Sequence, residues 1–211
     1  MSTFHHFLNK LFYALVATVA LSGCFDILNS GNIPLSNIQN QIVYAKKAKR
    51  VAKKTKKETA SEEWKWPQPS ATVYIDLKGD QNLIVATNHA IKVWNETGAF
   101  TFSKTKNKSQ ADIIVKSAYN PDVNYAGYTT FHFYVKSGQL FSADTTLNTY
   151  YLDNFSSYNY SYERVVNTVE HELGHAIGLK HNNGQSVMYP TGSIYSIQET
   201  DIETVKKLYN K

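Results

Sequence analysis

Hydrophobic and polar residues follow two clear periods from about residue 70 to the C-terminus. Val73, Ile75 and Leu77 alternate with Tyr74 and Asp76, which predicts a β-strand. A helix is predicted over 82–96, where apolar side chains recur every three or four positions: Leu83, Ala86, Ala90, Ile91 and Trp94. A glycine at position 98 is a typical end for this helix.

Further strands and a last helix follow in the pattern. Strands are predicted at 100–102, at 111–117, where a continuous apolar run fits a strand covered on both faces, and at 128–135 and 140–148 around a turn at 137–139. The aromatic-rich stretch 150–162 is either a loop or a lid. A capping box of Ser196 and Glu199 predicts a final helix with four inward residues: Ile202, Val205, Leu208 and Tyr209.

The strongest chemical signal is the stretch HELGHAIGLKH at 171–181. Apolar residues spaced by four predict a helix over 165–179. On that helix His171 and His175 lie one turn apart on one face, so both imidazoles can reach one zinc ion. Glu172 lies beside the first histidine, where it can take a proton from metal-bound water rather than bind the metal.

The third histidine, His181, requires the helix to end before it. Gly178 accepts the left-handed backbone conformation that ends a helix and turns the chain back. Three protein ligands then leave a fourth position open, which is typical of a catalytic zinc site. The non-functional alternative is a helix with surface histidines.

A second motif, Ser186-Val187-Met188-Tyr189-Pro190, follows closely. H-E-x-x-H-x-x-G-x-x-H followed by a methionine turn is the metzincin pattern. The sequence resembles the metzincin zinc metallopeptidases and, among them, the matrixins, in which Met-Tyr-Pro follows the zinc motif.

This resemblance implies a role for each matching residue. The zinc ligands would be His171, His175 and His181, with Glu172 as the catalytic base. Met188 would pack beneath the metal, and the other structural residues at the site would be Gly178, Tyr189 and Pro190. Tyr189 follows the methionine directly and is given no role as a ligand.

The resemblance covers roughly residue 66 to the C-terminus and implies an α+β fold. We expect a twisted, mixed five-stranded sheet packed against three main helices, with zinc in the cleft. Residues 191–195 would line the specificity pocket. An extended peptide would pair with an exposed strand edge within 125–135.

Other metal sites have weaker support. Outside the motif, the domain has only His89 and His132, too few for a histidine-rich second zinc site; both are interpreted as ordinary helix and strand residues. Calcium bound through Asp122, Asp144 or Asp153 stays open, because no twelve-residue calcium loop is present.

The N-terminal region has the layout of an export signal. Lys10 precedes an apolar run at 11–21, which is far shorter than the roughly 20 residues of a membrane span. Leu21-Ser22-Gly23-Cys24 then resembles a bacterial lipobox, in which the cysteine is lipidated. We expect residues 1–23 to be a lipoprotein-type signal peptide and the protein to be anchored in the cell envelope through Cys24; the alternative is a secreted protein.

The uneven distribution of charge separates an N-terminal linker from the rest of the chain. The net charge is +5, and 8 of the 22 basic residues fall within 46–57. Residues 24–63 are therefore interpreted as a tether and basic linker, and 64–211 as the peptidase domain, which is formally neutral. The basic stretch is either a helix on an anionic surface or a solvated linker. In both cases it would be attracted to membrane or wall surfaces, and nucleic acid is not an expected partner.

The predicted function is a zinc metalloendopeptidase that hydrolyses peptide bonds of extracellular or envelope proteins. One alternative is an envelope-attached binding protein with a structural, non-catalytic zinc site, against which the presence of Glu172 argues. Another is zinc-dependent hydrolysis of other amides, such as wall peptides.

Overall fold

The computed structural model describes residues 16–25, 63–153, 158 and 160–210. In this part of the chain one mixed sheet has the strand order β1-β5-β6-β4-β2-β3. The strands are β1 (Val16–Phe25), β2 (Ser70–Asp76), β3 (Thr101–Lys104), β4 (Ile113–Ala118), β5 (Tyr125–Tyr134) and β6 (Leu140–Asn148). The helices are α2 (Gln81–Glu96), α3 (Thr149–Leu152), α4 (Tyr162–Ala176) and α5 (Glu199–Leu208). The predicted α+β fold, with five mixed strands β2–β6 and three main helices, is confirmed.

The sheet changes direction at its β5 end. Strand β2 pairs in parallel with β3 and β4, and β4 pairs in parallel with β6, whereas β5 runs antiparallel to β6. The predicted hairpin joins these last two strands, and the Tyr134 amide donates to the Gln139 carbonyl at 2.9 Å. This antiparallel strand lies against α4, which carries the zinc motif.

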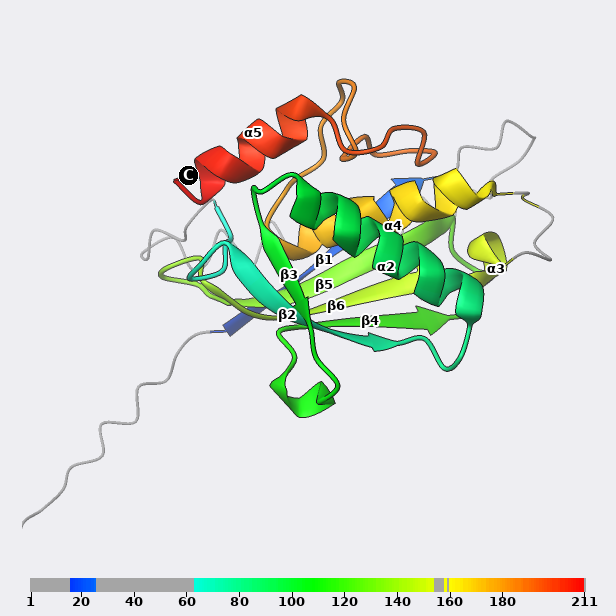
Figure 1. Ribbon diagram of the computed structural model, residues 1–211, viewed down its shortest axis with the longest axis horizontal. Helices are drawn as coiled ribbons and strands as arrows, with labels where there is room; N and C mark the ends of the chain where they lie inside the picture. Colours follow the sequence, from blue (N-terminus) through cyan, green and yellow to red (C-terminus); the bar gives the residue numbers. More distant parts are fainter. Residues whose placement is uncertain (1–15, 26–62, 154–157, 159, 211) are drawn as a thin grey trace, which may run out of the picture.

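Helices α2 and α4 lie across the same face of the sheet (Figure 1). The Asp80 side chain caps α2 by accepting from the Leu83 amide at 3.0 Å. Near the other end of α2, the fully buried Trp94 indole donates to the Glu170 carbonyl of α4 at 3.0 Å. This contact joins the two helices close to the predicted metal ligands.

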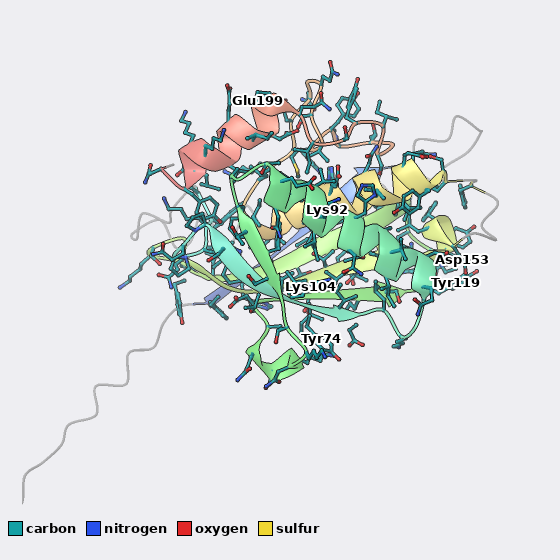
Figure 2. All side chains as sticks on the ribbon, in the orientation of Figure 1. Tyr74, Lys92, Lys104, Tyr119, Asp153 and Glu199 are labelled. Carbon is teal, nitrogen blue, oxygen red and sulfur yellow. The ribbon has the colours of Figure 1, made fainter. Side chains whose placement is uncertain are left out.

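The opposite face of the sheet is more polar. In β4, Ile113 and Val115 are buried but Ile114 is only half-buried, so the prediction of a strand covered on both faces is wrong for that residue. Tyr74 of β2 lies on this face, away from the two helices (Figure 2). The Lys116 ammonium pairs there with Asp144 at 2.9 Å.

The start of α5 differs from the prediction. The helix begins at Glu199, and its N-cap is Gln198 rather than Ser196. The backbone N–H of Gln198 donates to the Asp201 carboxylate at 2.9 Å. The predicted pairing of Ser196 with Glu199 is therefore wrong, because Asp201 provides the capping carboxylate. Of the four residues predicted to face inward, Val205 is fully buried.

Part of the predicted leader forms β1. This strand pairs antiparallel with β5 from Val16 opposite Tyr134 to Phe25 opposite Tyr125, and Cys24 lies within it. The prediction that the β5 edge is exposed is therefore wrong in the full chain, because β1 pairs along it. Most of the predicted tether, including its basic stretch 46–57, lies outside the described residues, as do 154–157 and 159 in the predicted loop or lid. No helix in the described part is long and apolar enough to cross a membrane.

Candidate metal centre

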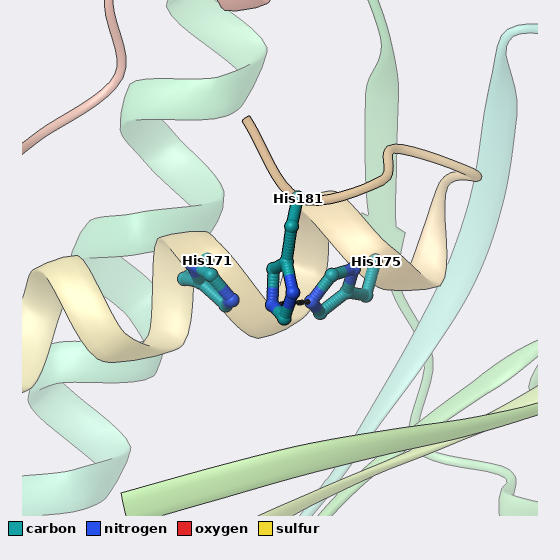
Figure 3. A group of neighbouring side chains, drawn as sticks. All are labelled: His171, His175 and His181. Carbon is teal, nitrogen blue, oxygen red and sulfur yellow. Dashed lines mark hydrogen bonds between the residues drawn. The ribbon is translucent and has the colours of Figure 1, made fainter. Parts of the chain in front are cut away.

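Three histidines converge at the end of α4 (Figure 3). His171 and His175 project from the helix, and His181 reaches back from the segment that follows it. One ligand atom from each lies within 4.8 Å of the others, and the Nε2 atoms of His175 and His181 are 3.2 Å apart. Among the described residues, these three histidines form the cluster of side chains that could hold a metal ion.

The backbone orients two of the three rings. His171 Nδ1 lies 2.6 Å from the Val187 carbonyl oxygen, and His175 Nδ1 lies 2.9 Å from that of Leu179. A carbonyl can only accept, so each Nδ1 carries the proton and each Nε2 presents a lone pair. The buried Nε2 of His171 has no hydrogen-bond partner among the described residues. A polar atom buried in this way calls for a ligand, and a zinc ion suits it.

Electrostatics keep the three rings in their metal-binding form. Burial lowers the pKa of His171 to about 3 and the pKa of His175 well below its usual value. The pKa of His181 is also lowered by burial. Neutral imidazole is the form that binds a metal, so the ligands need not lose a proton at neutral pH.

Gly178 makes the turn that brings His181 back. Its φ is +98°, a left-handed conformation that favours glycine, and α4 ends two residues earlier at Ala176. The position has a second constraint, because a Cβ there would overlap the carbonyl oxygen of Trp64. The neighbouring Trp66 indole donates to the Ala176 carbonyl at 2.9 Å. The first residues of the domain thus pack on the end of the zinc helix.

The methionine turn lies directly beneath the helix. Met188 is 2% exposed, and its sulfur lies so close to Gly174 that a Cβ there would overlap it. Asp201 of α5 holds this turn from below: its carboxylate accepts from the Ser186 hydroxyl and, at 2.9 Å, from the Val187 amide. Since the Val187 carbonyl accepts from His171, Asp201 supports a predicted ligand through one residue, Val187.

Glu172 is fully buried against β5. Its Oε2 accepts from the Thr129 hydroxyl at 2.8 Å, whereas its Oε1 has no partner among the described residues. Burial raises the pKa of Glu172 to about 8, and the hydrogen bond from Thr129 opposes this rise. The carboxylate does not belong to the three-histidine group.

The segment after Pro190 is fixed to α4 by side chains of the helix. Arg164 Nε donates to the Gly192 carbonyl at 2.9 Å, and Asn167 Nδ2 donates to the Ser193 carbonyl at 3.0 Å. The buried Glu170 accepts from the Ile197 amide at 3.2 Å. Three side chains of α4 therefore hold the segment 192–197 against the helix.

Residues outside the motif behave as ordinary structural residues. His89 contacts the Tyr162 hydroxyl from α2, and His132 of β5 contacts the Ser142 hydroxyl at 3.1 Å. Asp122, Asp144 and Asp153 do not belong to the three-histidine group, and calcium bound through them stays a prediction.

Sequence reasoning missed Thr129, Glu170 and Asp201, and it included Ser186 in the second motif without a role. Only Asp201 had a local signal, because it lies three residues after the cap that the structure reveals.

Comparison with known proteins agrees with this geometry. The family model of the matrixin peptidases matches residues 71–210. The chain belongs to the matrixin family.

Curated relatives of this matrixin include two proteins from Rattus norvegicus. Stromelysin-2 is 31% identical over 136 residues, which cover 59% of this chain and 28% of that protein. Macrophage metalloelastase is 30% identical over 134 residues, covering 57% and 27%. The matches thus span less than a third of the length of either relative. The family implies zinc, and the three neutral histidines with an unpartnered Nε2 fit that metal.

Proposed function

We propose that this matrixin is a zinc-dependent endopeptidase that hydrolyses peptide bonds of extracellular or envelope proteins, with Glu172 as the general base. The observation that carries the proposal is a pair of buried atoms on consecutive residues. His171 Nε2 and Glu172 Oε1 both lack a partner in the described structure. The histidine nitrogen is suited to a metal ion, and the glutamate oxygen is suited to the water that attacks a peptide carbonyl.

His171, His175 and His181 would hold the zinc ion. When bound, zinc supplies a Lewis acid that polarises a carbonyl group and makes water more acidic. Glu172 Oε1 would take the proton from the attacking water and pass it to the leaving amine nitrogen. The carboxylate must be ionised to begin this cycle, and a nearby cation favours ionisation by opposing the effect of burial on its pKa.

The β5 edge is the proposed binding site for the substrate backbone. This edge already accepts an extended, antiparallel segment, because β1 pairs with it along residues 125–134. A substrate strand would form the same kind of backbone hydrogen bonds in place of β1. Removal of a signal peptide of 23 residues would delete most of β1 and leave this edge free.

The proposed location is the cell envelope. A lipid on Cys24 would anchor the mature chain, and the basic stretch 46–57 would add attraction to anionic lipid or wall polymer. Mass spectrometry of the mature protein and of a Cys24→Ser variant tests this. A lipid-sized mass increase present only with the cysteine supports the anchor, and an unmodified mature chain indicates free secretion.

The central experiment uses the chain from Cys24 onward, which lacks most of β1, and compares it with its Glu172→Gln variant. Zinc per chain and cleavage of a quenched mixed-sequence peptide library are measured for both. One zinc in each, with cleavage only by the unmutated protein, supports the proposal. Zinc in each without cleavage by either would favour the binding-protein alternative, and wall-peptide fragments assayed in parallel test hydrolysis of other amides. A chain that binds no zinc would overturn the proposal.

A further inference from the structure

A buried hydroxyl group lies beside the proposed base. Thr129 of β5 faces α4, and both its side chain and that of Glu172 are fully buried. Thr129 Oγ1 is 2.8 Å from Glu172 Oε2 and 3.0 Å from the Glu172 backbone oxygen. A hydroxyl has one proton to donate, and an ionised carboxylate is the stronger of these two acceptors. The hydrogen bond to the carboxylate is therefore favoured when Glu172 is charged.

A second threonine completes this arrangement. Thr145 of β6 stands opposite Thr129 in the strand register, and the two hydroxyl oxygens are 3.2 Å apart. With Thr145 as the donor in this pair, the proton of Thr129 remains available for Glu172. Both threonines are fully buried, as is Phe131, two residues after Thr129 in β5.

Gly127 provides the space for the carboxylate. It lies two residues before Thr129, on the same face of β5, and is buried. A Cβ at this position would lie 2.9 Å from both Cγ and Oε1 of Glu172. The absent side chain lets Glu172 lie against the strand, while Thr129 binds one of its oxygens. The other oxygen, Oε1, is left without a partner in the described structure.

We propose that Thr129 is a positioning residue for Glu172: its hydroxyl binds Oε2 and thereby leaves Oε1 as the oxygen that acts as the base. This inference rests on the proposed role of Glu172. Without the hydroxyl, the carboxylate can rotate about its last bond and no longer presents one oxygen in a fixed direction. The loss affects the chemical step, because the three histidines are unchanged and the β5 edge would bind a substrate through its backbone rather than through the Thr129 side chain.

The test uses the same chain from Cys24 onward, with zinc, and a single peptide substrate taken from the library experiment. Thr129→Val keeps the shape of the side chain and removes its hydroxyl, whereas Thr129→Ser keeps the hydroxyl and removes a methyl group. Thr146→Val is the matched control, because Thr146 is also buried in the sheet, 2% exposed, and its hydroxyl makes no hydrogen bond in the described structure. For each variant, kcat, KM, zinc per chain and the thermal midpoint are measured.

We expect Thr129→Val to keep its zinc and its KM while kcat falls on the order of 10-fold or more, since a well-placed general base contributes about 10²–10⁴-fold. Thr129→Ser should recover most of kcat although it packs less well, and Thr146→Val should leave kcat unchanged. A role in packing alone predicts the reverse order, with Ser more damaging than Val.

Three results would overturn the inference in different ways. Equal kcat in Thr129→Val and Thr146→Val, with Glu172→Gln inactive, would reject the positioning role and leave the proposed function standing. Full activity in Glu172→Gln would reject both. If Thr129→Val does not fold, Thr129→Ser and Thr129→Ala form the test pair, because they differ by the hydroxyl alone; equal kcat in that pair would reject the inference.

Discussion

Replacing Gly174 by alanine should destabilise the protein, although alanine is the better helix former. Gly174 lies inside α4, one residue before His175, and its missing side chain makes room for the sulfur of Met188. Alanine in a helix interior is about 1 kcal/mol more favourable than glycine. Extra volume in a packed core costs about 1–3 kcal/mol, and Met188 is 2% exposed, so its side chain has little free space to move into. The two effects together predict a loss of up to about 2 kcal/mol in the free energy of unfolding.

The same substitution should have the opposite sign once Met188 is shortened. In a Met188→Ala background the overlap is gone, and Gly174→Ala should then raise the free energy of unfolding by up to about 1 kcal/mol. The expected coupling between the two sites is therefore about 1–3 kcal/mol, the size of the overpacking cost that shortening Met188 removes.

Urea unfolding of the four proteins, followed by tryptophan fluorescence at one pH and one zinc concentration, measures this double-mutant cycle. Equal slopes against urea are required before the free energies are compared. If Gly174→Ala changes the free energy of unfolding by the same amount in wild type and in Met188→Ala, the contact with the Met188 sulfur is not the reason for this glycine.

Three further predictions concern the supports of the site. Burial raises the pKa of Glu170 to about 7, so the folded state keeps a proton that the unfolded state loses above its ordinary pKa, and stability falls as pH rises between these values. Glu170→Gln retains an acceptor for the Ile197 amide. Its free energy of unfolding, measured with urea on metal-free protein, should therefore rise relative to that of wild type by up to about 3 kcal/mol between pH 5 and pH 8. A difference between the two proteins that does not change with pH would contradict this. Asp201→Asn loses one acceptor beneath the methionine turn and should weaken zinc binding about 10–100-fold in competition with a coloured chelator, and unchanged affinity would argue against support through Val187. Gly178→Ala would put a side chain on a residue with a left-handed backbone and bring its Cβ onto the Trp64 carbonyl oxygen. It should therefore lower the free energy of unfolding by about 2 kcal/mol or more. A smaller loss in urea unfolding would show that the turn adapts.

Local patterns predicted the elements that depend on local interactions. The period of apolar residues located α2 and α4, and the spacing of three histidines around Gly178 brought together the ligand group that the structure contains. These features depend on contacts within one or two helical turns, which a linear pattern records directly. The turn at Gly178 was predictable for the same reason, because its conformation belongs to one residue.

Features that depend on distant residues were not predictable in this way. Nothing near Thr129 distinguishes it from Thr130, its neighbour in the strand, until the helix that carries Glu172 packs on the sheet. The cap of α5 was misplaced because Asp201 is held by Val187 and Ser186 as well as by its own helix. The pairing of β1 with β5 joins segments about 110 residues apart in the sequence, and an apolar run does not reveal its partner.

The predicted metal ligands lie close together in the sequence, whereas the proposed base and the residue that supports it lie far apart. His171, His175 and His181 fall within one short segment, so bringing them together closes only a small loop. The hydrogen bond between Thr129 and Glu172, by contrast, joins residues 43 apart and forms only when α4 docks on β5. During folding, the ability to capture a metal can therefore arise before the acid–base geometry exists. Metal binding by the chain is consequently no proof that the acid–base geometry has formed.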